Sequence, residues 1–570
     1  MPSPGDQPAG KGSCPTVPEK PAYGDVAPGE RGSAAVKKDV PAGESAPADE
    51  GASGKKPEPG RVIRGVGWNL VGMIAGSIAG FLSSILLARY LGSSEYGELA
   101  LTLSVLNVLV IFTALGFEFA LNKYIPVFLC ENNPAGIRSL VRKLTWMKVA
   151  VSLALSVFIL LAADLIAAYL FQKPELGAYL RVLCLMVLPY SLESIYRGLL
   201  TGLYRQKFIN LLDVATKVLY LVLALAALLL SYGVTGVLFA NLIAMAFFIS
   251  LAARKGLASI PEGGKPGETV HLSRVLRYSF YLYIFTVMNF VLGQQLDLMM
   301  IGAMVPDIRQ VSFYTIAYSF SYISVSLLSL MLGGGITLTY FSELYARKDF
   351  DGLRRGYIIL CEYLFVYVMP ISIIGAVLAP DLLYLIYGEP YAGTDVVLLL
   401  ALYFLSMNFL KFGGVTSTFL SAMDQERKLV ISRTIFGLTN IILNFLLIPH
   451  FKAFGALIGT GVACLVGNSY ESVILHRSLG PRYPKRFWGR MVLLSVTAGL
   501  AAYDLRFILA PLAPSGGNAH AAFMLAGVGI PWLLLTLGLF LLLKPLSPET
   551  VEVVEKVPLP AKGLLLRLLR

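Results

Sequence analysis

From about residue 61 onward, the chain alternates between long apolar stretches and short polar segments. A helix needs about 20 apolar residues to cross the hydrocarbon core of a bilayer. Fourteen stretches come near that length, at roughly 65–88, 98–119, 145–166, 178–202, 211–231, 235–253, 278–303, 311–335, 355–378, 396–420, 429–448, 454–475, 488–510 and 521–543. The pattern therefore predicts an all-α, polytopic membrane protein with about fourteen transmembrane helices.

The two ends of the chain have a different character. Residues 1–60 are rich in Pro and Gly and contain no Leu, Ile, Phe or Trp. Such a composition cannot bury enough apolar surface to fold, so we expect a disordered cytoplasmic tail there. Residues 546–570 are expected to form a second cytoplasmic tail. Within it, the sequence AKGLLLRLLR at 561–570 predicts a short interfacial amphipathic helix.

The composition and the charge distribution agree with this class and predict an orientation. Hydrophobic residues make up 56% of the chain and charged residues 14%, whereas soluble domains carry about 25% charged residues. Cationic residues of short loops stay on the cytoplasmic side of a membrane. Alternate loops hold 23 and 6 of them, with Lys148 counted among the loop cations. We therefore expect a multi-pass protein of the cytoplasmic (inner) membrane with both termini in the cytoplasm.

An internal repeat predicts how the helices are grouped. Segments 201–214 and 421–434 both end one apolar stretch, turn on a basic loop and enter the next, with an offset of 220 residues. Gly236 and Gly455 align at an offset of 219. An even number of helices per repeat keeps both halves in one orientation. The predicted units are a six-helix lobe at 61–255, a cytoplasmic linker at 256–277, a second six-helix lobe at 278–477 and two extra helices at 478–545.

Charges inside apolar stretches are costly and mark candidate functional residues. Lys411 is the deepest cation along the predicted helices, with Asn408 close to it. An ammonium in a low-dielectric cavity is a suitable partner for a phosphate group. The alternative is a lysine that extends toward the lipid headgroups.

Two further pairs lie four residues apart, Glu193 with Arg197 and Asp213 with Lys217. This spacing places both members on one helix face. They are either self-neutralising pairs or a gated entrance in which Arg197 or Lys217 binds phosphate and the carboxylate is released. Arg433 aligns with Asp213 across the repeat, so these two could pair across the cleft in one state.

Asp297 and Glu362 are candidate gating or ion-coupling carboxylates, because burial makes proton exchange feasible near neutral pH. The coupling ion, if there is one, could be Na⁺ or H⁺. The five cysteines and four histidines are scattered and form no metal-ligand pattern. No cofactor, no metal site and no catalytic residue is expected.

The sequence LLARYLGSSEYGELAL at 86–101, followed by LGFEFALNKYIP at 115–126, resembles the opening of polysaccharide flippases of the Wzx (O-antigen) type. These belong to the multidrug/oligosaccharidyl-lipid/polysaccharide exporter superfamily. The sequence at 296–320 resembles the start of their second half. The resemblance implies two six-helix lobes in a V around a central cavity, which rock between inward-open and outward-open states. It also implies a polyprenyl-pyrophosphate-linked oligosaccharide as cargo.

The leading hypothesis is thus a transporter, not an enzyme, that moves this lipid-linked oligosaccharide from the cytoplasmic to the outer leaflet for cell-surface polysaccharide synthesis. Its expected partners are membrane lipids and possible polysaccharide polymerases or glycosyltransferases, with no nucleic acid. An ion-coupled multidrug exporter is the alternative, and Lys411, Arg197 and Lys217 favour an anionic cargo over it. A polytopic polymerase or ligase is disfavoured because the predicted outer loops are short.

Overall fold

The computed structural model describes residues 59–263, 272–291, 293–330, 334–481, 485–514 and 516–556. All regular secondary structure in these ranges is helical. The predicted tail, up to residue 58, and the predicted interfacial helix at 561–570 lie outside the described residues.

The helices follow one another along the chain with short connections. They are α1 (Pro59–Ala114), α2 (Phe117–Cys130), α3 (Pro134–Leu165), η1 (Ile166–Leu170), α4 (Leu176–Gly202), α5 (Gln206–Leu229), α6 (Gly233–Ala258), α7 (Leu272–Val291), α8 (Gln294–Met304), α9 (Arg309–Leu330), α10 (Gly334–Ala346), α11 (Phe350–Val377), α12 (Ala379–Tyr387), η2 (Glu389–Tyr391), α13 (Thr394–Ala422), α14 (Glu426–Phe451), α15 (Ala453–Leu479), α16 (Lys485–Leu509), η3 (Ala510–Leu512), α17 (Gly517–Leu543) and α18 (Pro548–Lys556).

Within the described residues, eleven helices are long and apolar enough to cross a membrane. The first of these, Ile74–Ala114, bends at Gly92 and covers two of the fourteen predicted stretches. Gly92 has a φ of 72°, a region that side-chain-bearing residues rarely adopt. The predicted stretches 278–303 and 311–335 fall on the pairs α7–α8 and α9–α10, each made of two shorter helices. The prediction of an all-α polytopic membrane protein is confirmed.

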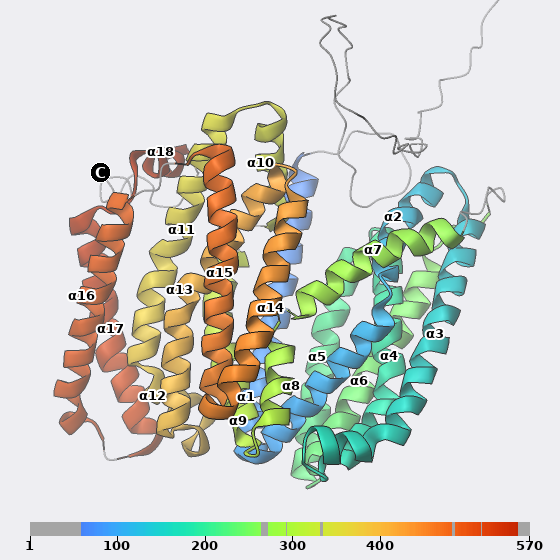
Figure 1. Ribbon diagram of the computed structural model, residues 1–570, viewed down its shortest axis with the longest axis horizontal. Coiled ribbons are helices and arrows are strands. Elements are labelled where there is room, and N and C mark those ends of the chain that lie inside the picture. The colour runs from blue at the N-terminus through green and yellow to red at the C-terminus, as the bar shows by residue number, and fades with distance from the viewer. Residues whose placement is uncertain are drawn as a thin grey trace, which may run out of the picture.

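The helices form two halves that meet along α1. Helices α1–α6 pack together as the first half, and α1 also packs against α8 and α9 of the second half, which runs from α7 to α15 (Figure 1). Helices α16 and α17 pack on α11 and α12 at the edge of the bundle, away from α1. One end of the bundle, called the terminal face here, carries the start of α1, the end of α10, and α18 (Figure 1). The opposite face carries η1, η2 and η3.

Equivalent positions of the predicted repeat make equivalent contacts. Arg197 of α4 bonds to Asp213 of α5, and Arg433 of α14 bonds to Ser417 of α13. Both pairs are 16 residues apart in the chain, and the offset of 220 carries one pair onto the other. The same two helix positions therefore touch in both halves, although the charges differ.

Candidate functional site

The central cavity lies between the two halves and has a volume of about 350 Å³. Helices α1, α5, α8 and α9 form its walls. It is lined by Gly80, Ser83, Ser84, Leu87, Tyr96, Leu99, Ala100, Leu103, Ser104, Asn107, Lys217, Tyr220, Gln294, Gln295, Leu298 and Thr315. Among the described residues in this lining, Lys217 is the one charged residue. The cavity thus offers a single cation in a setting of amides, hydroxyls and tyrosine rings.

Lys217 reaches the cavity because α1 presents small residues opposite it. Its Nζ donates to the carbonyl oxygen of Gly76 at 2.8 Å. A Cβ atom added at Gly76 would lie 3.3 Å from Nζ, and one added at Gly80 would lie 3.9 Å away. A side chain at Gly76 would crowd the ammonium group, whereas a Cβ atom at Gly80 would make an ordinary van der Waals contact with it. Gly76 of α1 therefore makes room for the cation of α5.

A second cavity of about 330 Å³ adjoins this one inside the first half. Tyr190, Glu193, Arg197, Asp213 and Asn241 lie in its lining, and it shares Lys217 and Tyr220 with the central cavity. The structure thus brings together four of the predicted site residues on α4 and α5. Their formal charges sum to zero, two acidic and two basic.

Arg197 is fully engaged by protein groups within this cluster. Its guanidinium donates to both carboxylate oxygens of Asp213, at 3.0 and 2.8 Å, and to Oε1 of Glu193 at 2.6 Å. Its Cζ lies 5.1 Å from the ring centroid of Phe248. A bidentate pair of this kind fixes the guanidinium geometry. Of the two predicted basic residues here, Lys217 is therefore the better placed to meet a ligand in the central cavity.

Lys148 is a buried cation that the sequence reasoning counted with the loops. Its side chain is 1% exposed and donates to the Ser194 hydroxyl of α4. The spacing of α3 contains the signal that was missed. Leu144, Lys148, Ser152 and Ser156 follow one another at intervals of four and are all buried, so Lys148 belongs to the packed face of α3.

The second half contains a buried carboxylate with neutral donors around it. Asp297 of α8 is 3% exposed. It accepts hydrogen bonds from the Tyr314 hydroxyl, from Asn444 Nδ2 at 2.7 Å and from Thr460 Oγ1 at 2.9 Å. Asn440 donates to Thr460 at 2.8 Å and extends the network. Asp297 follows Gln294 and Gln295 on α8 but is directed toward α9, α14 and α15 rather than into the central cavity.

The oxygen atoms of this cluster resemble the ligand set of a hard cation. Carboxylate, amide and hydroxyl oxygens suit Na⁺-like or larger hard ions, and a buried carboxylate without a cationic partner is costly. The hydrogen bonds that Asp297 accepts all come from neutral groups. The side-chain oxygen of Asn444 is buried and has no hydrogen-bond partner among the described residues. Binding of a proton or a small cation at Asp297 stays a prediction.

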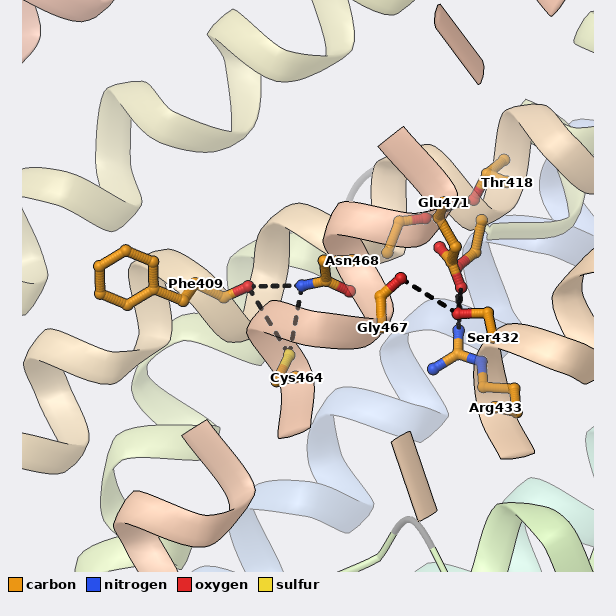
Figure 2. Close-up of polar contacts among 10 residues, drawn as sticks. Phe409, Thr418, Ser432, Arg433, Cys464, Gly467, Asn468 and Glu471 are labelled. Atoms are coloured by element: carbon orange, nitrogen blue, oxygen red, sulfur yellow. Dashed lines mark hydrogen bonds and ion pairs between the residues drawn. The ribbon is translucent and has the colours of Figure 1, made fainter. Parts of the chain in front are cut away.

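Arg433 belongs to a different network around Glu471 of α15. Glu471 is 1% exposed and accepts from Ser417 at 2.7 Å and from Ser432 at 2.8 Å, with Arg433 3.9 Å away. Figure 2 shows Ser432 between Glu471 and the Gly467 carbonyl, with Arg433 beside them. In this state Asp213 and Arg433 thus have other partners. Their predicted pairing across the cleft stays a prediction for another state.

Lys411 and Asn408 lie on α13, away from the central cavity. Asn408 donates to Ser372 of α11 at 2.7 Å and to the Leu405 carbonyl at 3.1 Å. Lys411 is half-buried and is not among the residues that line the central cavity. Two residues before Lys411, the Phe409 carbonyl accepts a hydrogen bond from Asn468 of α15 at 2.9 Å (Figure 2). Depth along the helix was known from the sequence, but the direction in which Lys411 points was not.

Glu362 of α11 binds the start of the C-terminal helix rather than a cavity. Its Oε2 accepts from the backbone nitrogen and hydroxyl of Ser547, both at 2.9 Å, and from Thr550 Oγ1 at 2.7 Å. The carboxylate thus caps the N-terminus of α18, where the helix dipole favours negative charge. Its suggested coupling role stays a prediction, while the contacts indicate a structural one.

Removing the donors to Glu362 is expected to weaken the attachment of α18. In the double variant Ser547→Ala with Thr550→Val, the fully buried carboxylate loses two side-chain donors, each worth about 1.5–3 kcal/mol for a charged acceptor. We expect the thermal unfolding midpoint in detergent to fall by several degrees. The control is Thr418→Val, which removes a hydroxyl that bonds only within its own helix. Equal midpoints for the double variant and the control would contradict this role.

Side chains of one half bind carbonyl groups of the other half at the opposite face. Lys173, 5% exposed, donates to the carbonyls of Gly302 and Val305 at the end of α8, both at 2.9 Å. Arg89 donates to the Leu385 carbonyl, and the Tyr391 hydroxyl donates to the Ala88 carbonyl at 3.2 Å. Carbonyls at helix ends lack intrahelical partners and favour cations. These bonds close the molecule at that face.

Replacing Lys173 by methionine is expected to loosen this closure, because two buried carbonyls lose their donor. In a background without the native cysteines, a Val305→Cys substitution reports on the interface. We expect its reaction with a membrane-impermeant maleimide to become about tenfold faster or more, since each lost charge-assisted bond is worth about 1.5–3 kcal/mol. Lys452→Met, an exposed lysine of the same face, is the control. An unchanged labelling rate would show that Lys173 does not hold the halves together.

The fold defines the class of this protein, an all-α polytopic membrane protein with a cavity between its two halves. A family model described as polysaccharide biosynthesis protein matches residues 86–395, more than half of the chain. The chain therefore belongs to the polysaccharide biosynthesis protein family. The resemblance noted in the sequence is therefore confirmed at the level of this family.

Known relatives agree with the fold. The lipid II flippase MurJ in an inward closed conformation superposes with a TM-score of 0.67 at 15% identity, over 82% of this chain and 98% of that one. An inward-facing multidrug resistance MATE family transporter of the MOP superfamily gives 0.55 at 15% identity, over 70% and 95%. An uncharacterized membrane protein of Methanocaldococcus jannaschii is 21% identical over 459 residues, 76% of this chain and 88% of the relative.

Proposed function

We propose that this protein moves a polyprenyl-pyrophosphate-linked oligosaccharide from the cytoplasmic to the outer leaflet of the cytoplasmic membrane. The family supports a role in polysaccharide biosynthesis. The observation that carries the proposal is the central cavity, which is lined by one cation, Lys217, and by no carboxylate among its described lining residues. An anionic headgroup finds a partner there. A cationic drug, the cargo of the alternative function, does not.

The orientation follows from the distribution of basic loops. The terminal face is the cytoplasmic one in this proposal, and the face closed by Lys173 and Arg89 is the outer one. The headgroup enters from the cytoplasmic side while the bonds at the opposite face hold the halves together. Opening at that face then releases the headgroup to the outer leaflet, with the polyprenyl chain remaining in the lipid. Enzymes that build or polymerise the glycan would act before and after this step.

The Asp297 cluster is the proposed coupling site. Its carboxylate sits among neutral donors, whereas Glu193 and Asp213 of the first half are already paired with Arg197. Binding of H⁺ or Na⁺ at Asp297 would change the charge of the wall behind α8. A bound ion shifts the balance of the two states only if it binds one state more tightly.

The test uses purified protein in liposomes that contain a fluorescent polyprenyl-pyrophosphate disaccharide. Leaflet movement is followed by quenching with dithionite, which reacts only with the exposed leaflet. We expect quenching beyond the outer-leaflet fraction with protein and none beyond it in protein-free liposomes. No lipid movement, combined with ion-driven efflux of a cationic dye, would overturn the proposal in favour of a multidrug exporter.

A further inference from the structure

The charges of the polar groups that line the central cavity bear on which sugar can lie next to the pyrophosphate. Apart from Lys217, the polar groups of the described lining are neutral, namely the amides of Asn107, Gln294 and Gln295 and several hydroxyls. The segment of the second half that follows α8 does not bring a further charge to the cavity wall. Between Asp307–Arg309 and Glu343 it contains no charged residue at all. Asp297 on α8 is directed away from the cavity and adds no positive charge to it.

One amide of this lining is an unused donor. The side-chain nitrogen of Gln294 is buried and has no hydrogen-bond partner among the described residues. A buried donor without a partner costs about 1–3 kcal/mol, so a ligand that supplies an acceptor oxygen relieves this cost. Gln294 is the first residue of α8, where the helix end also favours an electron-rich partner. A sugar hydroxyl meets this requirement without bringing in charge.

The tyrosines and the size of the cavity point to the same ligand chemistry. Tyr96 and Tyr220 border the cavity, and the Tyr96 hydroxyl is tied to Ser84 Oγ at 2.6 Å. Tyrosine offers an apolar ring face together with a polar tip, which suits a sugar ring. A volume of about 350 Å³ is at the small end of ligand sites, which span about 300–1,000 Å³. A cavity of this size has room for one sugar beside a pyrophosphate rather than for a whole oligosaccharide.

We infer that the cavity selects lipid-linked glycans whose first sugar is uncharged, with Gln294 and Gln295 as the specificity-determining residues. This rests on the proposed function. Lys217 is committed to the pyrophosphate, so a carboxylate on the first sugar would enter a low-dielectric site without a partner. Specificity then arises from the cost imposed on the wrong ligand as much as from contacts with the right one.

The test compares two fluorescent polyprenyl-pyrophosphate lipids that differ only at C6 of the sugar, one with glucose and one with glucuronic acid. In the liposome assay the wild type is expected to move the glucose lipid at least about tenfold faster, which corresponds to about 1.4 kcal/mol. Gln294→Lys is expected to reduce or reverse this ratio. Gln206→Lys, the same change at the start of α5 and outside the cavity lining, is expected to leave it unchanged.

The outcomes separate the inference from the proposed function. Equal rates for both lipids in the wild type overturn the inference and leave the proposed function standing. Movement of neither lipid overturns the proposed function and this inference with it. If Gln294→Lys is unstable, Gln295→Lys takes its place, and the wild-type comparison remains decisive by itself.

Discussion

Replacing Lys217 by methionine is expected to lower the rate of lipid movement at subsaturating substrate by about tenfold to a hundredfold. The reason is that the central cavity contains no second cation among its described lining residues. A hydrogen bond between charged partners is worth about 1.5–3 kcal/mol, and each 1.4 kcal/mol corresponds to a factor of ten. Methionine keeps the length and the apolar stem of the side chain, so packing against Gly76 and Gly80 is preserved.

The matched control is Lys207→Met on the same helix. Lys207 is exposed at the start of α5 and does not line either cavity. We expect this variant to transport like the wild type. A Lys217→Met variant with wild-type transport would show that Lys217 does not bind the pyrophosphate. If Lys411→Met were the defective variant instead, the substrate path would pass along α13 rather than between α1 and α8.

The second large effect is expected at Asp297. Asparagine has nearly the same shape but no charge, so the Asp297→Asn variant no longer needs a proton or a cation. We expect the component of transport that depends on an imposed Na⁺ or H⁺ gradient to disappear. Any remaining movement should then be equal in both directions. The measurement is leaflet movement with and without each gradient, in wild type and variant.

The control for Asp297 is Asp395→Asn, an exposed carboxylate at the start of α13. It is expected to retain the full gradient response. If Asp297→Asn also retained that response, the coupling site would lie elsewhere or transport would be uncoupled. A wild type that shows no response to either gradient would identify an equilibrating flippase, and the Asp297 network would then be structural.

Much of the fold could be predicted because long apolar stretches leave few alternatives in a membrane. The breaks within spans were harder to predict. Gly92 and Leu115–Gly116 require positive φ values, yet glycine is common in membrane helices for other reasons. At Gly116 a Cβ atom would lie 2.1 Å from the Ser279 carbonyl of α7. That close approach joins segments that are far apart in the chain, so no local sequence pattern predicts it.

The site was predicted only in part. The sequence shows how deep a residue lies along a helix, but it does not show toward which neighbouring helices its side chain points. The pairs at intervals of four on α4 and α5 were found, and they do meet in space. Asp297 was found by its type, but its partners Asn444 and Thr460 are 147 and 163 residues away. Glu362 binds residues 185–188 positions further along the chain. Such distant contacts depend on tertiary packing alone.

The most direct test of the central claim is a structure of the protein with a bound polyprenyl-pyrophosphate sugar, obtained by electron cryo-microscopy in lipid nanodiscs. We expect pyrophosphate density within hydrogen-bonding distance of Lys217 Nζ, with the first sugar against Gln294 and Gln295 and the polyprenyl chain leading out into the lipid. Pyrophosphate density on α13 beside Lys411, with the central cavity empty, would contradict it.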